Sequence, residues 1–374
     1  MNRALRWSGV LCGLLTAMGC GGTESASMPE PRESRAAQME ALTAKDAASS
    51  WTTTSALAYP RNYQQAALLN SGLVLVAGGR AIYPGIGEYP SSNADLYNPY
   101  SNTWQSTGSL ATPRYQFAAT RLASGKVLVC GGWDYYDMLS GAEVYDPATG
   151  AWSFAGGMGD RRSNHRATLL QSGKVLVTGG SLEVRNGPDV TFPGATTAAL
   201  YDPDANSWSS GGNVGHDTNG SLPVLLYSGE VMLLSGNRVD FYDPATNTWR
   251  QGPSMPGFGG SATRLYSGEV LVVGAGSEGN DTFLYNPYSG QWRSGPPTNE
   301  PHYLRPTATL LYSGEVLIAG GGATERYNPY TNTWTLLPNI PAAYQEASGV
   351  LLHTGQVMIT GGSYFHSAAA ILTP

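Results

Sequence analysis

The sequence predicts an all-β fold built from seven copies of one small antiparallel sheet, and three observations support this prediction. A turn of Ser or Thr followed by Gly recurs seven times, and an apolar run follows each turn. In five of the seven units a Gly-Gly pair ends that run. Charged residues make up only 13% of the chain, which contains 48 Gly and 24 Pro, a composition that suits short strands joined by tight turns.

The first two strands of each unit flank the Ser-Gly turn. In residues 167–180 two apolar runs are joined at Ser172-Gly173 and stopped by Gly179-Gly180, which is typical of a β-hairpin. The second run is apolar at consecutive positions, here Val175-Leu176-Val177, so both faces of that strand are predicted to be buried between neighbouring sheets. The seven turn glycines are Gly72, Gly125, Gly173, Gly229, Gly268, Gly314 and Gly355.

The third and fourth strands carry an aromatic signature. In six units a Tyr is followed by Asp or Asn and then Pro, a turn signal, and a Trp stands seven residues after the Tyr. The pairs are Tyr97 and Trp104, Tyr145 and Trp152, Tyr201 and Trp208, Tyr242 and Trp249, Tyr285 and Trp292, and Tyr327 and Trp334. We expect these rings to pack between sheets near the glycine pairs, where the missing Cβ atoms leave room.

The seventh unit stops at Pro374, where its Tyr-Asp-Pro signal would stand, and so lacks a fourth strand. Residues 51–61 match residues 104–114 without a gap, including the leading Trp and the closing Pro-Arg. The N-terminal strand is therefore predicted to complete the last sheet. Such pairing closes a circular array and removes its exposed edges.

Double glycine, then Tyr, then Trp, with Ser-Gly-Lys-Val-Leu-Val around the first turn, resembles the kelch repeat over residues 50–374. The resemblance implies a seven-bladed β-propeller of four-stranded kelch blades, its ring closed by the N-terminal strand.

The N-terminus has the form of an export signal. Arg3 and Arg6 precede an apolar run at 7–18, and Cys20 follows in a context that resembles a bacterial lipobox. We predict a signal peptide at 1–19, acylation of Cys20, and a flexible tether at 20–49. The protein is then expected in the bacterial cell envelope or secreted, as a lipoprotein held to the membrane only by its lipid. Ordinary export with cleavage elsewhere, or an uncleaved anchor, are the alternatives.

Composition and charge exclude some functions. The formal net charge is −6, whereas nucleic-acid binding requires a basic surface. Of three cysteines only Cys130 lies in the folded body, so no disulfide can form there. We expect a monomer without a metal or other cofactor.

The loops after strands two and four hold most of the length variation and share one face, which we call the loop-rich face. Variable loops on a rigid scaffold are the usual place for binding. On this face an Arg stands eleven residues before the turn glycine in three units, and other polar residues lie near the equivalent positions. The candidate ligand-binding residues there are Arg61, Arg114, Arg162, His165, Arg166, Arg305 and Glu346.

Two interpretations of these arginines stay open. They could form a pocket for a carboxylate or a sugar-like ligand, because Arg recognises planar anions with two hydrogen bonds. They could instead bind loop carbonyls and pair with acidic neighbours. Trp133 and Tyr135, interleaved with Asp134 and Asp137, are a second candidate, for stacking on sugar rings or for a protein partner.

Two classes of enzyme built from the same repeat offer alternative functions. Galactose oxidase-like copper radical enzymes need a Cys bonded to a Tyr, a Tyr next to a His, and another His, and the resemblance does not supply that set here. A sugar epimerase or mutarotase could use Arg162, His165, Arg166 and Glu346 as acid and base groups. The sequence favours a non-catalytic propeller that binds a protein or glycan partner through the loop-rich face.

Overall fold

The computed structural model describes residues 49–374 except 188, 276–277, 303–305, 320–322, 343, 345–346, 363–364 and 366. The described residues lie within one compact unit, Lys45–Pro374, and all of their regular elements are strands. The predicted signal peptide, Cys20 and almost all of the predicted tether lie outside the described residues.

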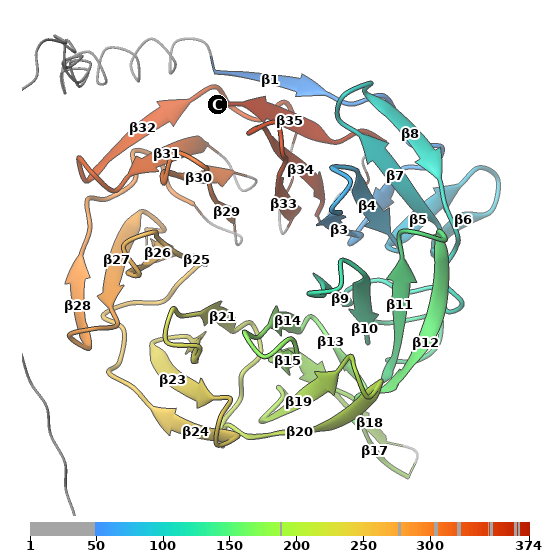
Figure 1. Cartoon of the computed structure of the whole chain (residues 1–374), viewed down its shortest axis with the longest axis horizontal. Helices are drawn as coiled ribbons and strands as arrows, with labels where there is room; N and C mark the ends of the chain where they lie inside the picture. Colours follow the sequence, from blue (N-terminus) through green and yellow to red (C-terminus); the bar gives the residue numbers. More distant parts are fainter. Residues whose placement is uncertain are drawn as a thin grey trace, which may run out of the picture. The chain divides into compact units, whose positions relative to one another are not determined.

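Seven four-stranded antiparallel sheets form a ring, with the first strand of each nearest the centre (Figure 1). The predicted all-β propeller fold is confirmed. Blade 1 consists of β3 (Gln65–Leu68), β4 (Val74–Ala77), β7 (Ala94–Asn98) and β8 (Thr103–Ser106). Blade 2 consists of β9 (Ala118–Arg121), β10 (Val127–Cys130), β11 (Gly141–Asp146) and β12 (Ala151–Gly157). Blade 3 consists of β14 (Arg166–Leu169), β15 (Val175–Thr178), β19 (Thr197–Asp202) and β20 (Ser207–Asn213).

Blades 4 to 6 repeat the same order of strands. Blade 4 consists of β21 (Leu222–Leu225), β22 (Val231–Ser235), β23 (Arg238–Asp243) and β24 (Thr248–Gln251). Blade 5 consists of β25 (Ser261–Arg264), β26 (Val270–Ala275), β27 (Asp281–Asn286) and β28 (Gln291–Ser294). Blade 6 consists of β29 (Thr307–Leu310), β30 (Val316–Ala319), β31 (Thr324–Asn328) and β32 (Thr333–Leu337).

Blade 7 is completed by the N-terminal strand, as the match between residues 51–61 and 104–114 predicted. It contains β33 (Ala347–Leu351), β34 (Val357–Gly361), β35 (Ala370–Thr373) and, as the outer strand, β1 (Ser50–Thr53). Strand β1 pairs antiparallel with β35, with Trp51 opposite Leu372 (Figure 1).

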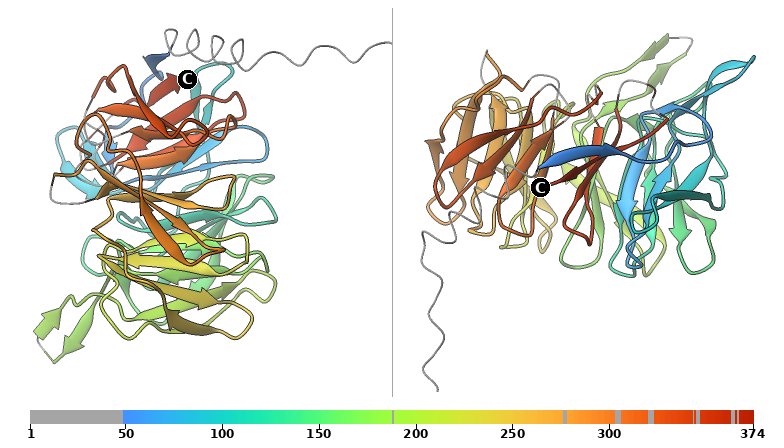
Figure 2. Two further views of the ribbon diagram at one scale, coloured as in Figure 1. Left: turned by 90° about the vertical axis from the view of Figure 1, so that its left-hand side faces the viewer. Right: turned by 90° about the horizontal axis from the view of Figure 1, so that it is seen from above.

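Smaller strands decorate the loop-rich face. They are β2 (Arg61–Asn62), β5 (Arg80–Tyr83), β6 (Gly87–Pro90), β13 (Arg162–Ser163), β16 (Ser181–Leu182), β17 (Val184–Asn186) and β18 (Asp189–Thr191). The hairpins β5–β6 and β17–β18 project from the same side of the ring (Figure 2). They fall in the two longest loops that the sequence placed on this face.

The core lies between adjacent blades. The second strand is fully buried, as in β4, β10 and β15, because a neighbouring sheet covers each of its faces. Between blades 2 and 3, for example, Leu128 and Cys130 share a cluster with Val175 and Val177. Fully burying one aliphatic side chain of this kind, relative to leaving it exposed, contributes about 1.5–3 kcal/mol to the free energy of folding.

The aromatic pairs do lie between blades, but not near the glycine pairs, so that part of the prediction is wrong. Strand β7 is antiparallel to β4, which places Tyr97 opposite Val74, at the start of β4, whereas Gly78 and Gly79 follow its end. The ring of Trp208 instead packs on Gly156 in the preceding outer strand and donates its indole hydrogen to Ala155 O at 2.7 Å. The other tryptophans of the repeat likewise donate to a carbonyl of the preceding blade or of the segment that leaves it.

The glycine pairs make room for the segment that leads into the next blade. A Cβ on Gly131 would lie 2.6 Å from Arg162 O, and the amide of Gly132 donates to that same oxygen at 2.9 Å. Gly131 and Gly132 also have φ angles of 61° and 93°. Close approach and positive φ together require glycine here.

Candidate functional site

The rim arginines stand where each chain segment enters its blade. Strand β2, with Arg61, pairs with β5, and β13, with Arg162, pairs with β16. The side chains of Arg61, Arg114 and Arg162 turn inward and are at most 2% exposed. Burial lowers the pKa of each guanidinium, and the neighbouring carboxylate acts in the opposite direction.

The hydrogen bonds of Arg114 show what these side chains do. Its Nη1 donates to Gly131 O and Gly141 O, both at 2.9 Å, and its Nη2 donates to Glu143 Oε1 at 2.9 Å. The buried Glu143 carboxylate also accepts the backbone amides of Ala111 and Thr112. The guanidinium therefore ties the second and third strands of blade 2 to the segment that arrives from blade 1.

Other blades repeat this arrangement with different residues. Arg61 pairs with Asp95 at 2.6 Å, His216 with Asp240 at 2.8 Å, and His302 with Glu325 at 3.2 Å. In each case, Glu143 included, the acid stands two residues before the Tyr of the third strand. We call these four pairs the Tyr−2 latches. Sequence reasoning missed the acids, although their fixed offset from the Tyr was a usable signal.

Blade 3 lacks an acid at this offset, and the two terminal nitrogens of Arg162 bind other partners. It donates to Thr197 O and Thr197 Oγ1, both at 3.1 Å, and to Asp160 at 3.3 Å. In blade 6 the Glu325 carboxylate also accepts the amides of Asn299 and Glu300. Burial acts to raise the pKa of Glu325, but the hydrogen bonds from His302 and these amides outweigh it and lower the pKa.

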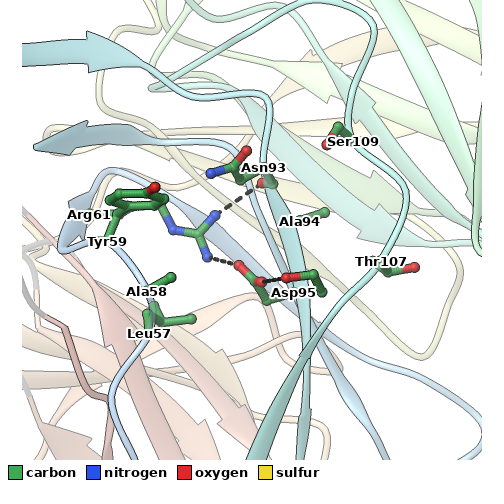
Figure 3. Close-up of a pocket in the computed structure, with 10 residues that line it drawn as sticks. Leu57, Ala58, Tyr59, Arg61, Asn93, Ala94, Asp95, Thr107 and Ser109 are labelled. Atoms are coloured by element: carbon green, nitrogen blue, oxygen red, sulfur yellow. Dashed lines mark hydrogen bonds and ion pairs between the residues drawn. The ribbon is translucent and has the colours of Figure 1, made fainter. Parts of the chain in front are cut away.

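A small cavity lies beside Arg61, and this side chain forms part of its wall. It measures about 120 Å³ and lies between residues 57–61, the start of β7 and the segment after β8. Figure 3 shows the guanidinium directed at Asn93 and Asp95 rather than into open space. Small-molecule sites usually occupy ~300–1,000 Å³, so this cavity is too small for a sugar.

His165 is buried beneath the rim rather than exposed on it. Its Nε2 lies 3.0 Å from Cys130 O and 3.5 Å from Cys130 Sγ. Burial, followed by the charge of Arg162, lowers the pKa of His165 to about 3, so the ring is neutral at pH 7. Burial also raises the pKa of the Cys130 thiol to about 12, which keeps it protonated.

The structure therefore does not bring the rim candidates together as a pocket. Arg61, Arg114, Arg162 and His165 are buried and bonded within the protein, as the second interpretation of the arginines describes. Arg166, at the start of β14, is exposed. Arg305 and Glu346 lie outside the described residues, as does the predicted lipidation site Cys20.

Replacement of Arg114 by Met is expected to lower the free energy of unfolding by about 3 kcal/mol, because it leaves the Glu143 carboxylate buried beside only two backbone donors. Urea unfolding monitored by tryptophan fluorescence measures this loss. The matched control is Arg166→Met, which changes an exposed arginine and is expected to cost less than about 1 kcal/mol. Equal losses in the two variants would contradict a latch function for Arg114.

A group of aromatic side chains is exposed on the loop-rich face of blades 1 to 3. Tyr135 stacks on Tyr89 with ring centroids 5.4 Å apart, Tyr136 meets Tyr135 edge-on at 4.8 Å, and Trp133 packs on Phe192 at 5.3 Å. Tyr136 is 82% exposed, and Tyr135 and Phe192 about half. We call these five residues the aromatic patch. It contains both Trp133 and Tyr135, the second pair of candidates.

Charged residues beside the aromatic patch hold its loops in place. Asp134 closes the loop 133–138 by accepting the amides of Tyr136 and Asp137 at 2.7 and 2.8 Å. Asp137 and Glu183 both pair with Arg185, and Glu183 accepts the amide of Met138 at 3.0 Å. The loop of blade 2 is thereby fixed to the long loop of blade 3, and Asp134 acts as a turn residue within the first of them.

None of the described residues forms a helix long and apolar enough to cross a membrane.

Comparison with known proteins gives one motif and one structural likeness. Residues 114–159 match the Kelch motif, and no curated protein matches the sequence. Among solved structures the chain is similar to a fungal alcohol oxidase of the AA5 family, described as catalytically diverse and solved in complex with copper. That likeness has a TM-score of 0.67 at 15% identity and covers 87% of this chain and 76% of the other. At this identity it shows the fold alone.

The residues of this chain do not fit a copper radical site. The family pattern needs a Cys bonded to a Tyr, whereas Cys130 is buried with its sulfur against His165. His216 pairs with Asp240 of blade 4 and His302 with Glu325 of blade 6, so the two histidines lie at different blades. Within the described part of the chain, no three side chains of His, Cys, Asp or Glu gather as a metal site would require.

Proposed function

We propose that this kelch-repeat β-propeller is a non-catalytic binding protein, exported and anchored by Cys20, that engages a protein partner through the aromatic patch. The single observation that carries the proposal is the exposure of Tyr135, Tyr136 and Phe192 on loops held by ion pairs. Tyr and Trp are enriched where proteins bind one another, because each buries a large apolar area and keeps a polar tip.

The charges around the patch support a protein partner rather than a small ligand. Asp137 pairs with Arg185, and Arg80 pairs with Glu88 while its guanidinium lies 5.5 Å above the Tyr115 ring. Such exposed ion pairs form a polar rim around an aromatic centre, the usual arrangement of an interface. Loops already fixed in the free protein lose less entropy on binding. A carbohydrate-active enzyme would need accessible acid and base groups, and Arg162 and His165 are buried.

The proposal is tested by photo-crosslinking with the full-length chain in its source cells. A photoreactive amino acid replaces Tyr136 in one variant and Ala148, on the opposite face, in another. We expect a discrete protein adduct from position 136 and none from position 148.

The affinity of the crosslinked partner is then measured. Tyr135→Ala/Tyr136→Ala is expected to raise its dissociation constant at least roughly tenfold, since two interface tyrosines are removed. Tyr288→Ala, a variant on the opposite face, is expected to leave the affinity unchanged. No adduct from position 136, or equal affinity of the double variant and the wild type, would refute a partner site at the aromatic patch.

A further inference from the structure

Six exposed tyrosines gather on the face opposite the aromatic patch. This face carries the Ser-Gly turns and the Asn/Asp-Pro turns, and we call it the Ser-Gly face. Three of the tyrosines directly precede a Ser-Gly turn and three follow an Asn-Pro pair. They are between 48% and 75% exposed: Tyr227, Tyr266, Tyr312, Tyr288, Tyr330 and Tyr100. We call this set the tyrosine arc.

The members of the arc approach each other across the turn glycines. A Cβ placed on Gly268 would lie 2.8 Å from Tyr288 Oη and 3.3 Å from Tyr227 Cδ2. The same point on Gly314 would lie 2.6 Å from Tyr330 Oη and 3.2 Å from Tyr266 Cδ2. Each pair thus joins a Tyr of one blade to a Tyr of the next, and the same arrangement recurs in adjacent blades.

The turns themselves do not require tyrosine. The positions before the Ser-Gly turn in blades 2 and 3 are Ala123 and Gln171, and the position after Pro is Ala148 in blade 2 and Ala245 in blade 4. Around Gly173, where Ala123 and Asp204 stand in place of the tyrosine pair, a groove of about 460 Å³ opens instead. The fold is therefore complete without these rings, and exposed aromatic groups of this size usually mark a binding surface.

Two carboxylates of this half of the face are already paired with arginines within the protein. Glu230 pairs with Arg250 at 2.8 Å and Glu269 with Arg293 at 3.1 Å. Arg264 lies 3.9 Å above the Tyr227 ring and donates to Leu225 O. A surface of this kind complements an uncharged ligand. An anionic membrane or a nucleic acid would require a cluster of unpaired cations.

The geometry points to a second binding site: the tyrosine arc binds a neutral polysaccharide, with the rings stacked on the C–H faces of the sugars. Tyrosine combines a flat apolar ring with a hydroxyl group, and a pyranose presents both an apolar face and hydroxyls. Repetition of the tyrosine pair over adjacent blades suits a repeating polymer, because several weak contacts on one chain add to a higher overall affinity. This site is separate from the aromatic patch and does not depend on the proposed protein partner.

The test is retention of the full-length chain on insoluble neutral polysaccharides, namely cellulose, chitin and curdlan, with alginate beads as the charged comparison. We expect retention on at least one neutral polymer and not on alginate. Replacement of Tyr227, Tyr266, Tyr288 and Tyr330 by Ala is expected to weaken it at least roughly tenfold. Replacement of the same four by Phe is expected to keep most of it, because the rings remain.

Two controls separate this site from other causes. The Ala variant is expected to keep the melting temperature of the wild type, because Ala already occupies equivalent positions. Tyr135→Ala/Tyr136→Ala, on the opposite face, is expected to bind the polysaccharide as the wild type does. The inference is overturned if no neutral polymer retains the protein. It is also overturned if Tyr135→Ala/Tyr136→Ala, rather than the variant of the tyrosine arc, loses retention. It is also overturned if the arc instead mediates binding to phosphatidylcholine vesicles.

Discussion

Deletion of residues 50–58 is expected to open the ring and to lower the free energy of unfolding by on the order of 5 kcal/mol or more, a large share of a typical domain's total. The deletion removes strand β1, which pairs with β35 over residues 370–373. It also removes Trp51, whose indole donates to Pro338 O at 2.8 Å, and the buried Leu57. The same segment reaches blade 1, because Ser55 O accepts the indole hydrogen of Trp104 at 2.8 Å.

The loss is measured as the melting temperature and the urea midpoint of the deletion variant of the full-length chain. Because β35 would become an exposed edge, we also expect dimers or larger species in size-exclusion chromatography. The control replaces residues 186–190 by two glycines, which shortens the exposed tip of the β17–β18 hairpin and keeps Arg185 with its partners Asp137 and Glu183. That control is expected to cost about 1 kcal/mol at most. A ring that melts at the wild-type temperature without residues 50–58 would show that β1 does not close it.

Acidification is expected to destabilise the protein through His165. The folded pKa of this buried ring is about 3, whereas an unfolded His has a pKa of ~6.5, so between these values the unfolded state binds more protons. Stability is therefore retained above pH 6.5 and decreases as the pH falls toward 3. The contribution of His165 amounts to about 3 kcal/mol lost between pH 7 and pH 4.

The contribution is isolated by comparison with His165→Gln, which keeps a donor for Cys130 O but does not titrate. We expect the free energy of unfolding, measured in urea at several pH values, to fall more steeply for the wild type than for the variant, by about 3 kcal/mol over the interval. The surroundings favour the neutral ring, because Arg114, Arg162 and Arg166 all oppose its protonation. Parallel pH curves for the two proteins would show that His165 is accessible to protons in the folded state.

Most of the fold could be predicted from local signals. Each Ser-Gly turn lies between two strands that pair with each other, and each Tyr-Asx-Pro turn joins the third strand to the fourth. Because every unit repeats these short-range signals, the number of sheets followed from the number of turns. The match between residues 51–61 and 104–114 then predicted the pairing of β1 with β35, the most distant in sequence.

The candidate site was less predictable, because the direction of a side chain depends on neighbours far away in sequence. The spacing of Arg114 from the turn glycine placed it at the mouth of blade 2, but only the packed blade shows its guanidinium turned inward to Glu143 and two backbone carbonyls. A buried charge requires such partners, since an unpaired one would cost several kcal/mol, and the partner was 29 residues away. Trp133 and Tyr135 stand two residues apart in the sequence, but the rings that they contact, Phe192 and Tyr89, come from other blades.

The sequence by itself determined the all-β repeat, the turn positions and the strand that completes blade 7, because these depend on hydrogen bonds between adjacent segments and on local turn chemistry. Only the tertiary structure decided which polar residues are buried and which aromatic residues are shared by one surface. Tyr100 and Tyr330 stand 230 residues apart in the chain and belong to the same face. They do so because a closed ring turns every equivalent turn toward the same side.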